Sequence, residues 1–336
     1  MRACELQTEF GITSLKIVDC PEPAVKPGHV RLRMKAWSLN YRDLMVVRGQ
    51  YNPKLKFPFV PLSDGVGEVV EVGEGVDTVK VGARVCPLFM PLWQAGRLND
   101  MQGKSALGGA WPGVLADTVV MPAGGVTAVP EHLTDAEAAT LPCAAVTAWH
   151  AVITAGQIQP GDTVLIQGTG GVSLFALQFA LLAGATVIAT SSSDEKLARV
   201  LKMGAAHGIN YRTQPDWEVA VRDLTKGAGV RHIVEVGGAG TMPKSLKAVQ
   251  TAGTISLIGV LTGGAGEFNP LPILMKNIRV QGIYVGSGEM FSAMNQAISR
   301  HQIRPTIDRV FKMDEVQAAF RHLESGQHFG KVVIQG

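Results

Sequence analysis

A glycine-rich turn between an apolar strand and a helix is the feature that most constrains this chain. Gly168-Thr169-Gly170-Gly171-Val172-Ser173 follows the apolar run Thr163–Gln167 and opens the apolar segment Val172–Ala183. Glycine there allows a tight turn and a close backbone approach to a pyrophosphate, and the helix N-terminus favours negative charge. Ser173 stands where the pattern usually has glycine or alanine, so the motif alone is weak. Together with its flanking segments it predicts a dinucleotide site at Gly168, Gly170, Gly171 and Val172.

The segment that begins at Thr163 alternates apolar strands with helices. Strands are predicted at 163–167, 186–190, 232–236, 254–258 and 279–284. One helix is predicted at 172–183, and a second is capped by Ser192 or Ser193 and ends at Gly204. This alternation is typical of a parallel, doubly wound sheet. No charged residue occurs from Thr163 to Ser193, but glycines and glutamines interrupt the stretch. We therefore interpret it as a buried α/β unit and not as a membrane span.

The first ~125 residues have the pattern of short strands instead. Apolar and polar residues alternate from His29 to Ala36, and Gly65–Val72 is a second predicted strand. Residues 92–113 are polar and contain glycine, which predicts a long loop. Thr134 and Glu137 form a capping-box pattern before a helix that Pro142 should interrupt. Near the C-terminus, an amphipathic helix is predicted at 314–326 and a strand at 331–335.

Length and charge restrict the possible partners. The 336 residues suggest two domains, and only 18% of them are charged, with a net charge of +3. The chain has no run of lysine and arginine, so we expect no nucleic-acid partner and no membrane partner. A surface poor in charge favours an oligomer.

The four cysteines indicate a reducing compartment. Cys4, Cys20, Cys86 and Cys143 form no C-x-x-C pair and have no histidine at ligand spacing. Charged residues near the N-terminus interrupt any apolar start, so no signal peptide is expected. We predict a cytoplasmic protein.

The end of the second predicted strand indicates which dinucleotide would bind. An NAD site usually has an acid there, but residues 188–193 contain none and include Ser191 and Ser192. Lys196 lies just beyond, and Tyr211 follows the region of the third strand. Hydroxyls and a cation suit a 2′-phosphate, which favours NADPH over NADH. The alternative is that the serines only cap a helix and that Lys196 is solvated.

Several segments resemble the medium-chain dehydrogenase/reductase superfamily over essentially the whole chain. They are Pro58–Gly75, Val79–Val85, Leu141–Trp149, the glycine turn and Gly330–Ile334. The resemblance implies a GroES-like, β-rich catalytic domain formed by residues 1–126 and 296–336. It also implies a Rossmann domain over residues 127–295 and a cofactor cleft at the junction of the two.

Zinc-containing members of this superfamily carry a cysteine where this chain has Asn40, and His-Glu where it has Ser63-Asp64. Cys143 matches the third ligand position. Asn40 and Ser63 are poor zinc ligands beside a thiolate and an imidazole, and residues 90–114 contain no cysteine for a structural zinc site. We predict no metal.

The stretch Ser38–Tyr51 resembles enoyl reductase domains and the zinc-free quinone oxidoreductases. The resemblance implies that Asn40 contacts the nicotinamide ribose or a substrate oxygen and that Tyr51 donates a proton. Hydride delivery to an activated double bond needs only a donor for the developing enolate and a proton source. Asn40 and Tyr51 are therefore the candidate catalytic residues.

The same resemblance assigns further positions to the cofactor. It implies that Thr147 contacts the nicotinamide end, that Gly259, Val260, Ile283 and Tyr284 line the nicotinamide pocket, and that Lys331 lies close to the adenosine phosphate. It also implies that residues 253–286 form the contact of a homodimer. His150, His207 and His232 are interpreted as structural or solvent-facing.

The leading functional hypothesis is a zinc-free, NADPH-dependent oxidoreductase. Its substrate would be a small electrophile: an enone, an enoyl thioester or a quinone. An NAD(P)-dependent alcohol or aldehyde dehydrogenase is the first alternative, although the missing zinc ligands count against it. A non-catalytic NADPH-binding structural protein is the second.

Overall fold

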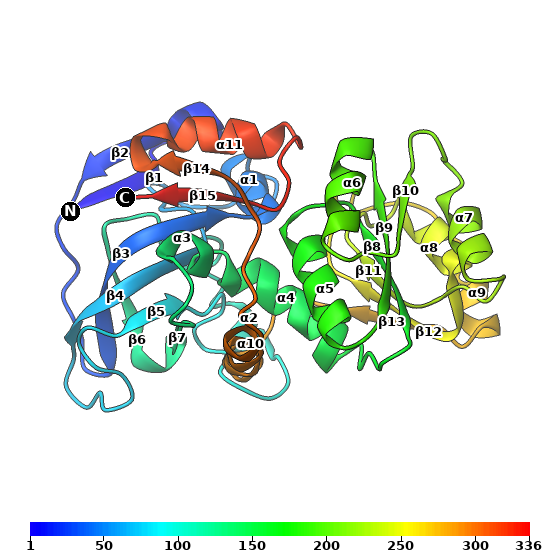
Figure 1. The fold of residues 1–336 in the computed structure, drawn as a ribbon. Coiled ribbons are helices and arrows are strands. Elements are labelled where there is room, and N and C mark those ends of the chain that lie inside the picture. The colour runs from blue at the N-terminus through cyan, green and yellow to red at the C-terminus, as the bar shows by residue number, and fades with distance from the viewer. The chain divides into compact units, whose positions relative to one another are not determined.

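The computed structural model describes residues 1–336 and divides them into two compact units (Figure 1). The first unit comprises Met1–Val146 and Gly286–Gly336, and the second comprises Thr147–Val285. The sequence predicted boundaries after residues 126 and 295, so the first unit contains more of the chain than expected. Both chain ends belong to one unit, and the second unit is one continuous segment.

Residues 127–146 and 286–295 were predicted to belong to the Rossmann domain, and their contacts explain why they belong to the first unit. β7 (Val126–Ala128) pairs with β5 (Arg84–Pro87) in the sheet of the first unit. Arg84 then donates hydrogen bonds to two carbonyl oxygens of the segment that follows β7. After the second boundary, Asn295 donates to the carbonyl oxygen of Ala128 at 2.8 Å. These pairings hold residues 127–146 and 286–295 to the first unit.

The first unit is built on a seven-stranded sheet and a separate antiparallel pair, β1–β2. The strands besides β5 and β7 are β1 (Arg2–Leu6), β2 (Leu15–Asp19), β3 (His29–Leu39), β4 (Asp64–Val72), β6 (Thr118–Pro122), β14 (Ile307–Lys312) and β15 (Lys331–Gln335). The order is β14-β15-β3-β4-β5-β7, and β6 also pairs with β3. β3 confirms the strand predicted from alternation, and β4 confirms the one predicted at Gly65–Val72.

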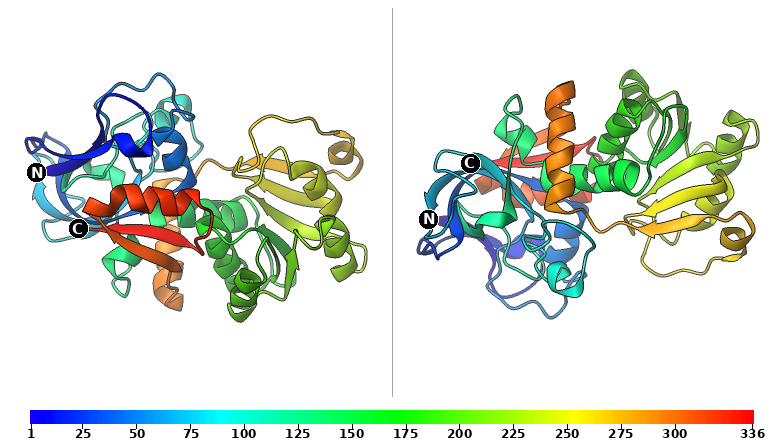
Figure 2. Two further views of the ribbon diagram at one scale, coloured as in Figure 1. Left: turned by 90° about the horizontal axis from the view of Figure 1, so that it is seen from above. Right: turned by 90° about the horizontal axis from the view of Figure 1, so that it is seen from below.

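The C-terminal strand is paired far back in the chain. β15 runs antiparallel to β3 with Val332 opposite Leu39, and parallel to β14. The predicted amphipathic helix forms as α11 (Val316–Glu324) and lies against β14 and β15 (Figure 2). Its Phe320 is fully buried in the same core as Trp37 of β3. This register brings the start of β15 beside the end of β3.

The second unit is a six-stranded sheet of parallel strands in the order β10-β9-β8-β11-β12-β13. The strands are β8 (Thr163–Gln167), β9 (Thr186–Ser191), β10 (His207–Asn210), β11 (Val230–Glu235), β12 (Val249–Leu257) and β13 (Arg279–Gly282), and the helices are α5 (Gly171–Leu182), α6 (Asp194–Lys202), α7 (Trp217–Leu224), α8 (Met242–Ala248) and α9 (Leu271–Met275). α5 and α6 cover one face of the sheet, and α7 and α8 cover the other (Figure 1). The predicted doubly wound sheet is confirmed.

The remaining helices are short except for one. They are α1 (Tyr41–Val47), α2 (Asp100–Gly103), α3 (Asp135–Ala138), α4 (Val146–Trp149), α10 (Gly288–His301), η1 (Ile12–Ser14), η2 (Ala123–Gly125) and η5 (Met313–Glu315). The capping box before α3 is present, since Thr134 Oγ1 accepts a hydrogen bond from Glu137 N and a Glu137 oxygen accepts one from Thr134 N. Beyond Pro142 the helix continues irregularly, with wider π-helical turns at η3 (Leu141–Ala145) and η4 (His150–Thr154).

The charge-free stretch from Thr163 to Ser193 contains β8, α5 and β9. α5 has only 12 residues, fewer than the ~20 that a bilayer requires. None of the helices has both the length and the apolar character needed to cross a membrane.

Candidate active site

Polar and charged side chains are buried in the first unit where β3 ends and α1 begins. We call them the buried polar cluster: Asn40, Arg42, Asp43, Ser63, Asp64 and Lys331. All but Arg42 are at most 9% exposed, and the Arg42 side chain is 11% exposed. Asparagine is favoured directly before a helix, and the Asn40 N–H donates to the Asp43 carboxylate at 2.8 Å across the first turn of α1.

Lys331, the first residue of β15, reaches into this cluster. Its ammonium donates to the carbonyl oxygen of Leu39 at 2.7 Å and to Asn40 Oδ1 at 2.5 Å. The Asp64 carboxylate is 3.9 Å away. Lys331 is only 3% exposed, so its charge is balanced inside the protein and not by water.

Asp64, the first residue of β4, is fully buried and accepts two hydrogen bonds. Ser63 Oγ donates to it at 2.7 Å and the Cys143 backbone N–H at 3.1 Å. Burial raises the pKa of Asp64 to about 6, although the Lys331 ammonium opposes the rise. Burial, and then the nearby Asp64 carboxylate, also raise the pKa of the Cys143 thiol. Cys143 is therefore a protonated thiol at neutral pH.

Arg42 connects the cluster to Tyr51. Its Nη1 donates to Asp43 at 3.1 Å and to the carbonyl oxygen of Leu107 at 2.8 Å. The guanidinium carbon lies 4.7 Å from the centre of the Tyr51 ring and 5.1 Å from that of Phe89. Burial raises the pKa of Asp43, while Arg42 lowers it. The two predicted catalytic residues are thus linked, from Tyr51 through Arg42 and Asp43 to Asn40.

The structure places the predicted cofactor residue Lys331 in this cluster. The resemblance implied that it lies close to the adenosine phosphate of the cofactor. In the structure its ammonium lies among the buried polar side chains, with Asn40 and Leu39 as hydrogen-bond partners. Contact with a phosphate would require these two hydrogen bonds to break.

The residues at the zinc-ligand positions do not fit a zinc ion. Asn40 Oδ1 accepts from an ammonium, and Ser63 Oγ donates to Asp64. A zinc ion there would also lie close to the Lys331 charge. No group of three or more His, Cys, Asp or Glu side chains is arranged to hold a metal.

The raised pKa of Asp64 predicts an unusual dependence of stability on pH. The folded protein binds this proton more tightly than the unfolded chain does, so this carboxyl adds stability as the pH falls and the contribution is lost as the pH rises through about 6. Relative to Asp64→Asn, the wild type should gain about 2 kcal/mol of unfolding free energy between about pH 7 and about pH 4. Denaturant titrations of both proteins measure this difference, and a constant or opposite difference would contradict it. Asp308→Asn is the control with the opposite sign: burial raises the pKa of Asp308, but the hydrogen bonds from His322 and the Phe329 N–H, together with the nearby histidines, lower it by more.

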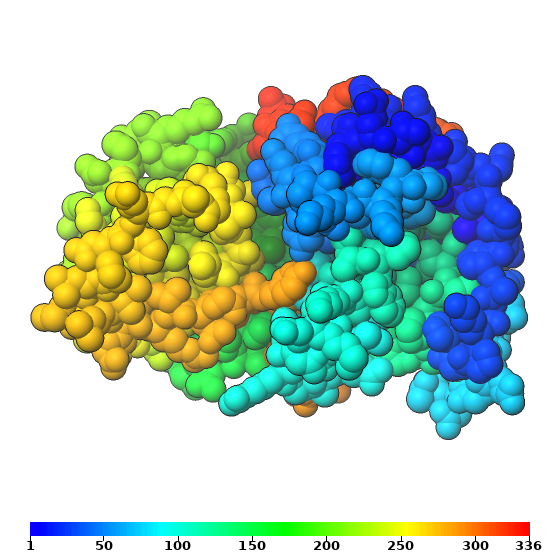
Figure 3. Space-filling model, turned by 180° about the vertical axis from the view of Figure 1, so that it is seen from behind, coloured from blue at the N-terminus to red at the C-terminus, as the bar shows by residue number.

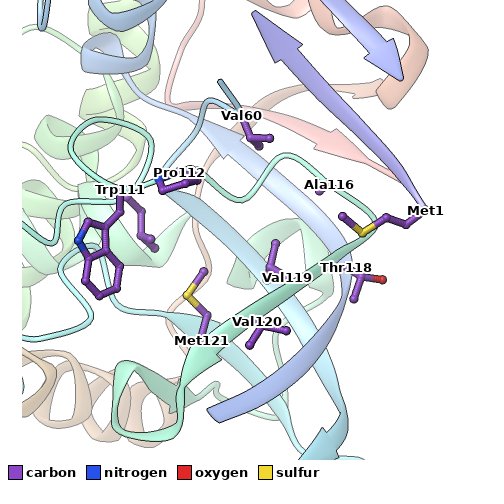
Figure 4. Close-up of a pocket in the computed structure, with 11 residues that line it drawn as sticks. Met1, Val60, Trp111, Pro112, Ala116, Thr118, Val119, Val120 and Met121 are labelled. Carbon is purple, nitrogen blue, oxygen red and sulfur yellow. The ribbon is translucent and has the colours of Figure 1, made fainter. Parts of the chain in front are cut away.

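A surface pocket of the first unit does not coincide with the cluster. It has a volume of about 200 Å³ and is lined mainly by apolar side chains, including Met1, Val60, Trp111 and Met121 (Figure 4). None of its lining side chains is charged. We place no part of the active site there.

The glycine turn of the second unit has the geometry of a dinucleotide site. Gly168 has φ of +71°, and its N–H donates to the carbonyl oxygen of Thr190 at the end of β9. A Cβ built on Gly168 or Gly170 would meet no protein atom within 4 Å. Internal packing therefore does not require glycine at Gly170, which leaves open space for a ligand backbone to approach. These residues fit the pyrophosphate of a bound dinucleotide.

Ser173 explains why this chain departs from the usual pattern. Its hydroxyl donates to the carbonyl oxygen of Gln167 at 2.7 Å, across the glycine turn. Ser173 is 2% exposed, so the bond is shielded from water. The serine fastens the first turn of α5 to the end of β8.

The residues proposed to read the 2′-phosphate lie together at the ends of β9 and β10. The Ser191 carbonyl accepts from Tyr211 N at 3.0 Å, and its hydroxyl accepts from Ser193 N. Ser193 Oγ in turn accepts from Lys196 N, so Ser193 caps α6. Ser191 is 3% exposed and Tyr211 is 42% exposed, so the Tyr211 side chain is more accessible than the Ser191 hydroxyl. Ser192 directly follows β9 and is half-buried.

The other predicted cofactor residues also belong to the second unit. Gly259 and Val260 follow β12, and Ile283 and Tyr284 follow β13. Because the strands are parallel, their carboxyl ends share one edge of the sheet with the glycine turn. Val260 and Tyr284 are 41% and 40% exposed, and Thr147, on α4, is 2% exposed.

Glu235 was missed by the sequence analysis. It is fully buried at the end of β11, and its carboxylate accepts from Gln167 Nε2 at 2.7 Å and from Thr241 Oγ1 at 2.6 Å. The N–H groups of Gly237 and Gly238 donate to it at 2.8 and 3.0 Å, and the hydroxyl of Ser245 also donates. Gln167 directly precedes the glycine turn, so Glu235 fastens that turn to the loop after β11.

The histidines fit the structural interpretation. His232 is completely buried on β11, and burial lowers its pKa to about 3, so the ring is neutral. His150 Nδ1 lies 2.7 Å from the carbonyl oxygen of Val285, and His207 is exposed. None of the three belongs to the buried polar cluster.

Arg42, Asp43 and Asp64 were also not predicted as site residues. Asp43 carried a usable signal, because an acid three residues after Asn40 at a helix start can accept from its N–H. Arg42 and Asp64 carried none, since their neighbours come from segments far away in the sequence.

Family profiles match most of the chain. One described as "Alcohol dehydrogenase GroES-like domain" matches residues 26–131, and one described as "Zinc-binding dehydrogenase" matches residues 171–300. A zinc-type alcohol dehydrogenase-like protein of Schizosaccharomyces pombe is 43% identical over 317 residues, which is 93% of this chain and 92% of that protein. Quinone oxidoreductase-like protein 2 of Rattus norvegicus is 30% identical over 94% of this chain and 86% of its own length.

Solved structures agree with this relationship. A crystal structure from Sinorhizobium meliloti 1021, provisionally named an alcohol dehydrogenase, superposes with a TM-score of 0.92 at 44% identity. The match covers 99% of this chain and 98% of that one. It extends over the GroES-like first unit and the Rossmann-type second unit alike. The chain therefore belongs to the medium-chain dehydrogenase/reductase superfamily, whose oxidoreductases bind a nicotinamide cofactor.

Proposed function

We propose that this oxidoreductase is a zinc-free, NADPH-dependent reductase of small electrophiles, namely enones, enoyl thioesters or quinones. The observation that most supports this proposal is the hydrogen bonding of the residues at the zinc-ligand positions. Lys331 donates a hydrogen bond to Asn40 Oδ1, and Ser63 Oγ donates one to Asp64. The two side-chain oxygens at the zinc-ligand positions are therefore already engaged inside the protein. Without a Lewis acid, an unactivated alcohol or ketone is a poor substrate, whereas a conjugated acceptor is already polarised.

The residues of the first unit supply what such a reaction needs besides hydride. Bound NADPH would supply the hydride to the electrophilic carbon. Hydrogen-bond donors then stabilise the negative charge that develops on the substrate oxygen. Asn40 is the candidate donor for that oxygen. Tyr51 is the candidate proton source, and the Arg42 guanidinium holds its ring by a cation–π contact.

The preference for NADPH is supported by Lys196 and Tyr211. We expect Lys196→Ala combined with Tyr211→Phe to raise the Kd for NADPH by about tenfold or more, because a charge-assisted contact to the 2′-phosphate is lost. The Kd for NADH should change by less than about twofold. Fluorescence titration of both nucleotides measures this. Equal losses for NADH and NADPH would refute the assignment, and Lys202→Ala on the same helix is the control.

A homodimer is proposed from the apolar surface of the second unit. Large apolar side chains are exposed after β12, on α9 and along β13, namely Val260, Leu261, Phe268, Leu271, Leu274, Met275, Val280 and Tyr284. The segment that carries them, in yellow and orange in Figure 3, lies at the surface. β13 is an edge strand with one side unpaired, so a second copy could extend the sheet. Sedimentation equilibrium of the wild type and of Leu274→Glu tests this.

Turnover tests the proposed reaction. NADPH oxidation should be measured with an enone, a quinone and an enoyl thioester, and with primary alcohols in the reverse direction. Reduction of conjugated acceptors that survives treatment with 1,10-phenanthroline supports the proposal. Chelator-sensitive alcohol oxidation would favour the alcohol dehydrogenase alternative, and NADPH binding without any turnover would favour a structural role.

A further inference from the structure

Lys331 is fixed in place by the backbone on either side of it. Gly330 has φ of +89°, and a Cβ on it would lie 2.3 Å from the carbonyl oxygen of Thr306. The Lys331 N–H donates to that same carbonyl at 2.9 Å, and the next residue, Val332, pairs with Leu39. The chain therefore enters β15 at a fixed position, directly beside the end of β3.

The ammonium of Lys331 determines which way the Asn40 carboxamide faces. A lysine ammonium carries only donors, so the group 2.5 Å from it must be the amide oxygen of Asn40. A second ammonium hydrogen is held by the Leu39 carbonyl. Flipping the amide would place two donors against each other, which the buried site does not allow.

The opposite side of the same amide carries two donor hydrogens. Asn40 Nδ2 is buried, and Asn40 as a whole is 9% exposed. The Asn40 side chain lies close enough to the Asp64 carboxylate to help lower the pKa of Asp64, but Nδ2 makes no well-formed hydrogen bond within the protein. That contact uses at most one of the two hydrogens, so the other is available to an oxygen atom of a bound ligand.

We propose that Lys331 is a positioning residue that acts through Asn40. Its ammonium holds and polarises the carboxamide so that the Nδ2 hydrogens, and not the oxygen, are offered to an oxygen atom of the bound ligand. This role rests on the proposed function, in which a substrate or cofactor oxygen approaches Asn40. It replaces the role at the adenosine phosphate that the sequence suggested for Lys331.

A double-mutant cycle tests the proposal. The proteins are the wild type, Lys331→Met, Asn40→Ala and the double variant, with 3-penten-2-one and NADPH as probes. Each single change should lower kcat/KM by about tenfold or more, and the double variant should be no worse than Asn40→Ala. Lys331→Arg, which can donate to both oxygens, should stay within about threefold of the wild type. Lys35→Met is the control, because Lys35 lies on β3 with an exposed ammonium near Glu68.

Other readouts separate this role from a structural one and from phosphate binding. The Kd ratio of NADPH to NADH should be unchanged in Lys331→Met. Losses in kcat/KM that multiply in the double variant would overturn the proposal. The proposal would also be overturned if Lys331→Met bound NADPH more weakly but NADH equally well, because that would place Lys331 at the 2′-phosphate. If Lys331→Met does not fold, Lys331→Gln takes its place in the cycle, since its amide can still donate to one oxygen.

Failure of the proposed function gives a different result. In that case the wild type itself does not reduce the enone. The Kd for NADPH of the same four proteins then decides the role of Lys331. If the double variant loses no more affinity for NADPH than Asn40→Ala does, Lys331 acts through Asn40. If its loss equals the product of the two single losses, the two residues act independently and the proposal is overturned.

Discussion

Replacing Tyr51 with phenylalanine should lower turnover by about a hundredfold or more, because the proton source is lost. The Kd for NADPH should remain within about twofold of the wild-type value. The phenyl ring can keep its place beside the Arg42 guanidinium, whose carbon lies 4.7 Å from the ring centre, so the substitution removes little more than the hydroxyl. Stopped-flow measurement of NADPH oxidation under single-turnover conditions isolates the chemical step.

Tyr41→Phe is the matched control for this experiment. Tyr41 begins α1, close to Tyr51 in the sequence, but its side chain is 42% exposed. Its removal should leave the rate within about twofold of the wild type. If Tyr51→Phe turns over at the wild-type rate, the proton comes from water and Tyr51 has no catalytic role.

The second large effect is expected at Glu235. Glu235→Gln places an amide NH2 among groups that are themselves donors, so at least one buried donor loses its acceptor. We expect a loss of about 2 to 4 kcal/mol in unfolding free energy, in the range for hydrogen bonds to a buried charge. Urea titration followed by circular dichroism measures it.

The same substitution should weaken cofactor binding. Gln167, which donates to Glu235, directly precedes Gly168, so a displaced Gln167 would disturb the glycine turn. The Kd for NADPH should rise by about fivefold or more. Glu68→Gln is the control, because this partly exposed acid pairs with Arg33 and Lys35 at the surface. It should cost about 1 kcal/mol or less. Equal losses of unfolding free energy and of NADPH affinity in the two variants would show that the hydrogen bonds of Glu235 contribute no more than those of the control acid.

Local patterns were sufficient to predict most of the fold. Alternation of apolar residues identified β3, a second strand was predicted where β4 lies, and the succession of strands and helices from Thr163 identified the doubly wound sheet. These signals depend on each residue's near neighbours in the chain. The two compact units divide at other residues than the predicted boundaries because β7 and Asn295 are held to the first unit by contacts with distant segments.

The candidate site was only partly predictable for the same reason. The sequence identified Asn40, Tyr51 and the glycine turn from motifs. It could not show that Lys331 lies against Asn40, because the two are 291 residues apart and meet only through the pairing of β15 with β3. Ser173 was interpreted as a weakness in the motif, whereas its hydroxyl closes the turn. Glu235 lay unremarked inside a predicted strand, and its role depends on donors from three other segments.

The most direct test of the central claim combines metal analysis with cofactor titration on one preparation of the purified protein. The account predicts zinc far below one atom per chain and a lower Kd for NADPH than for NADH. Stoichiometric zinc together with a preference for NADH would contradict it. The oxygen atoms of Asn40 and Ser63 would then be metal ligands, and the alcohol dehydrogenase interpretation would take precedence.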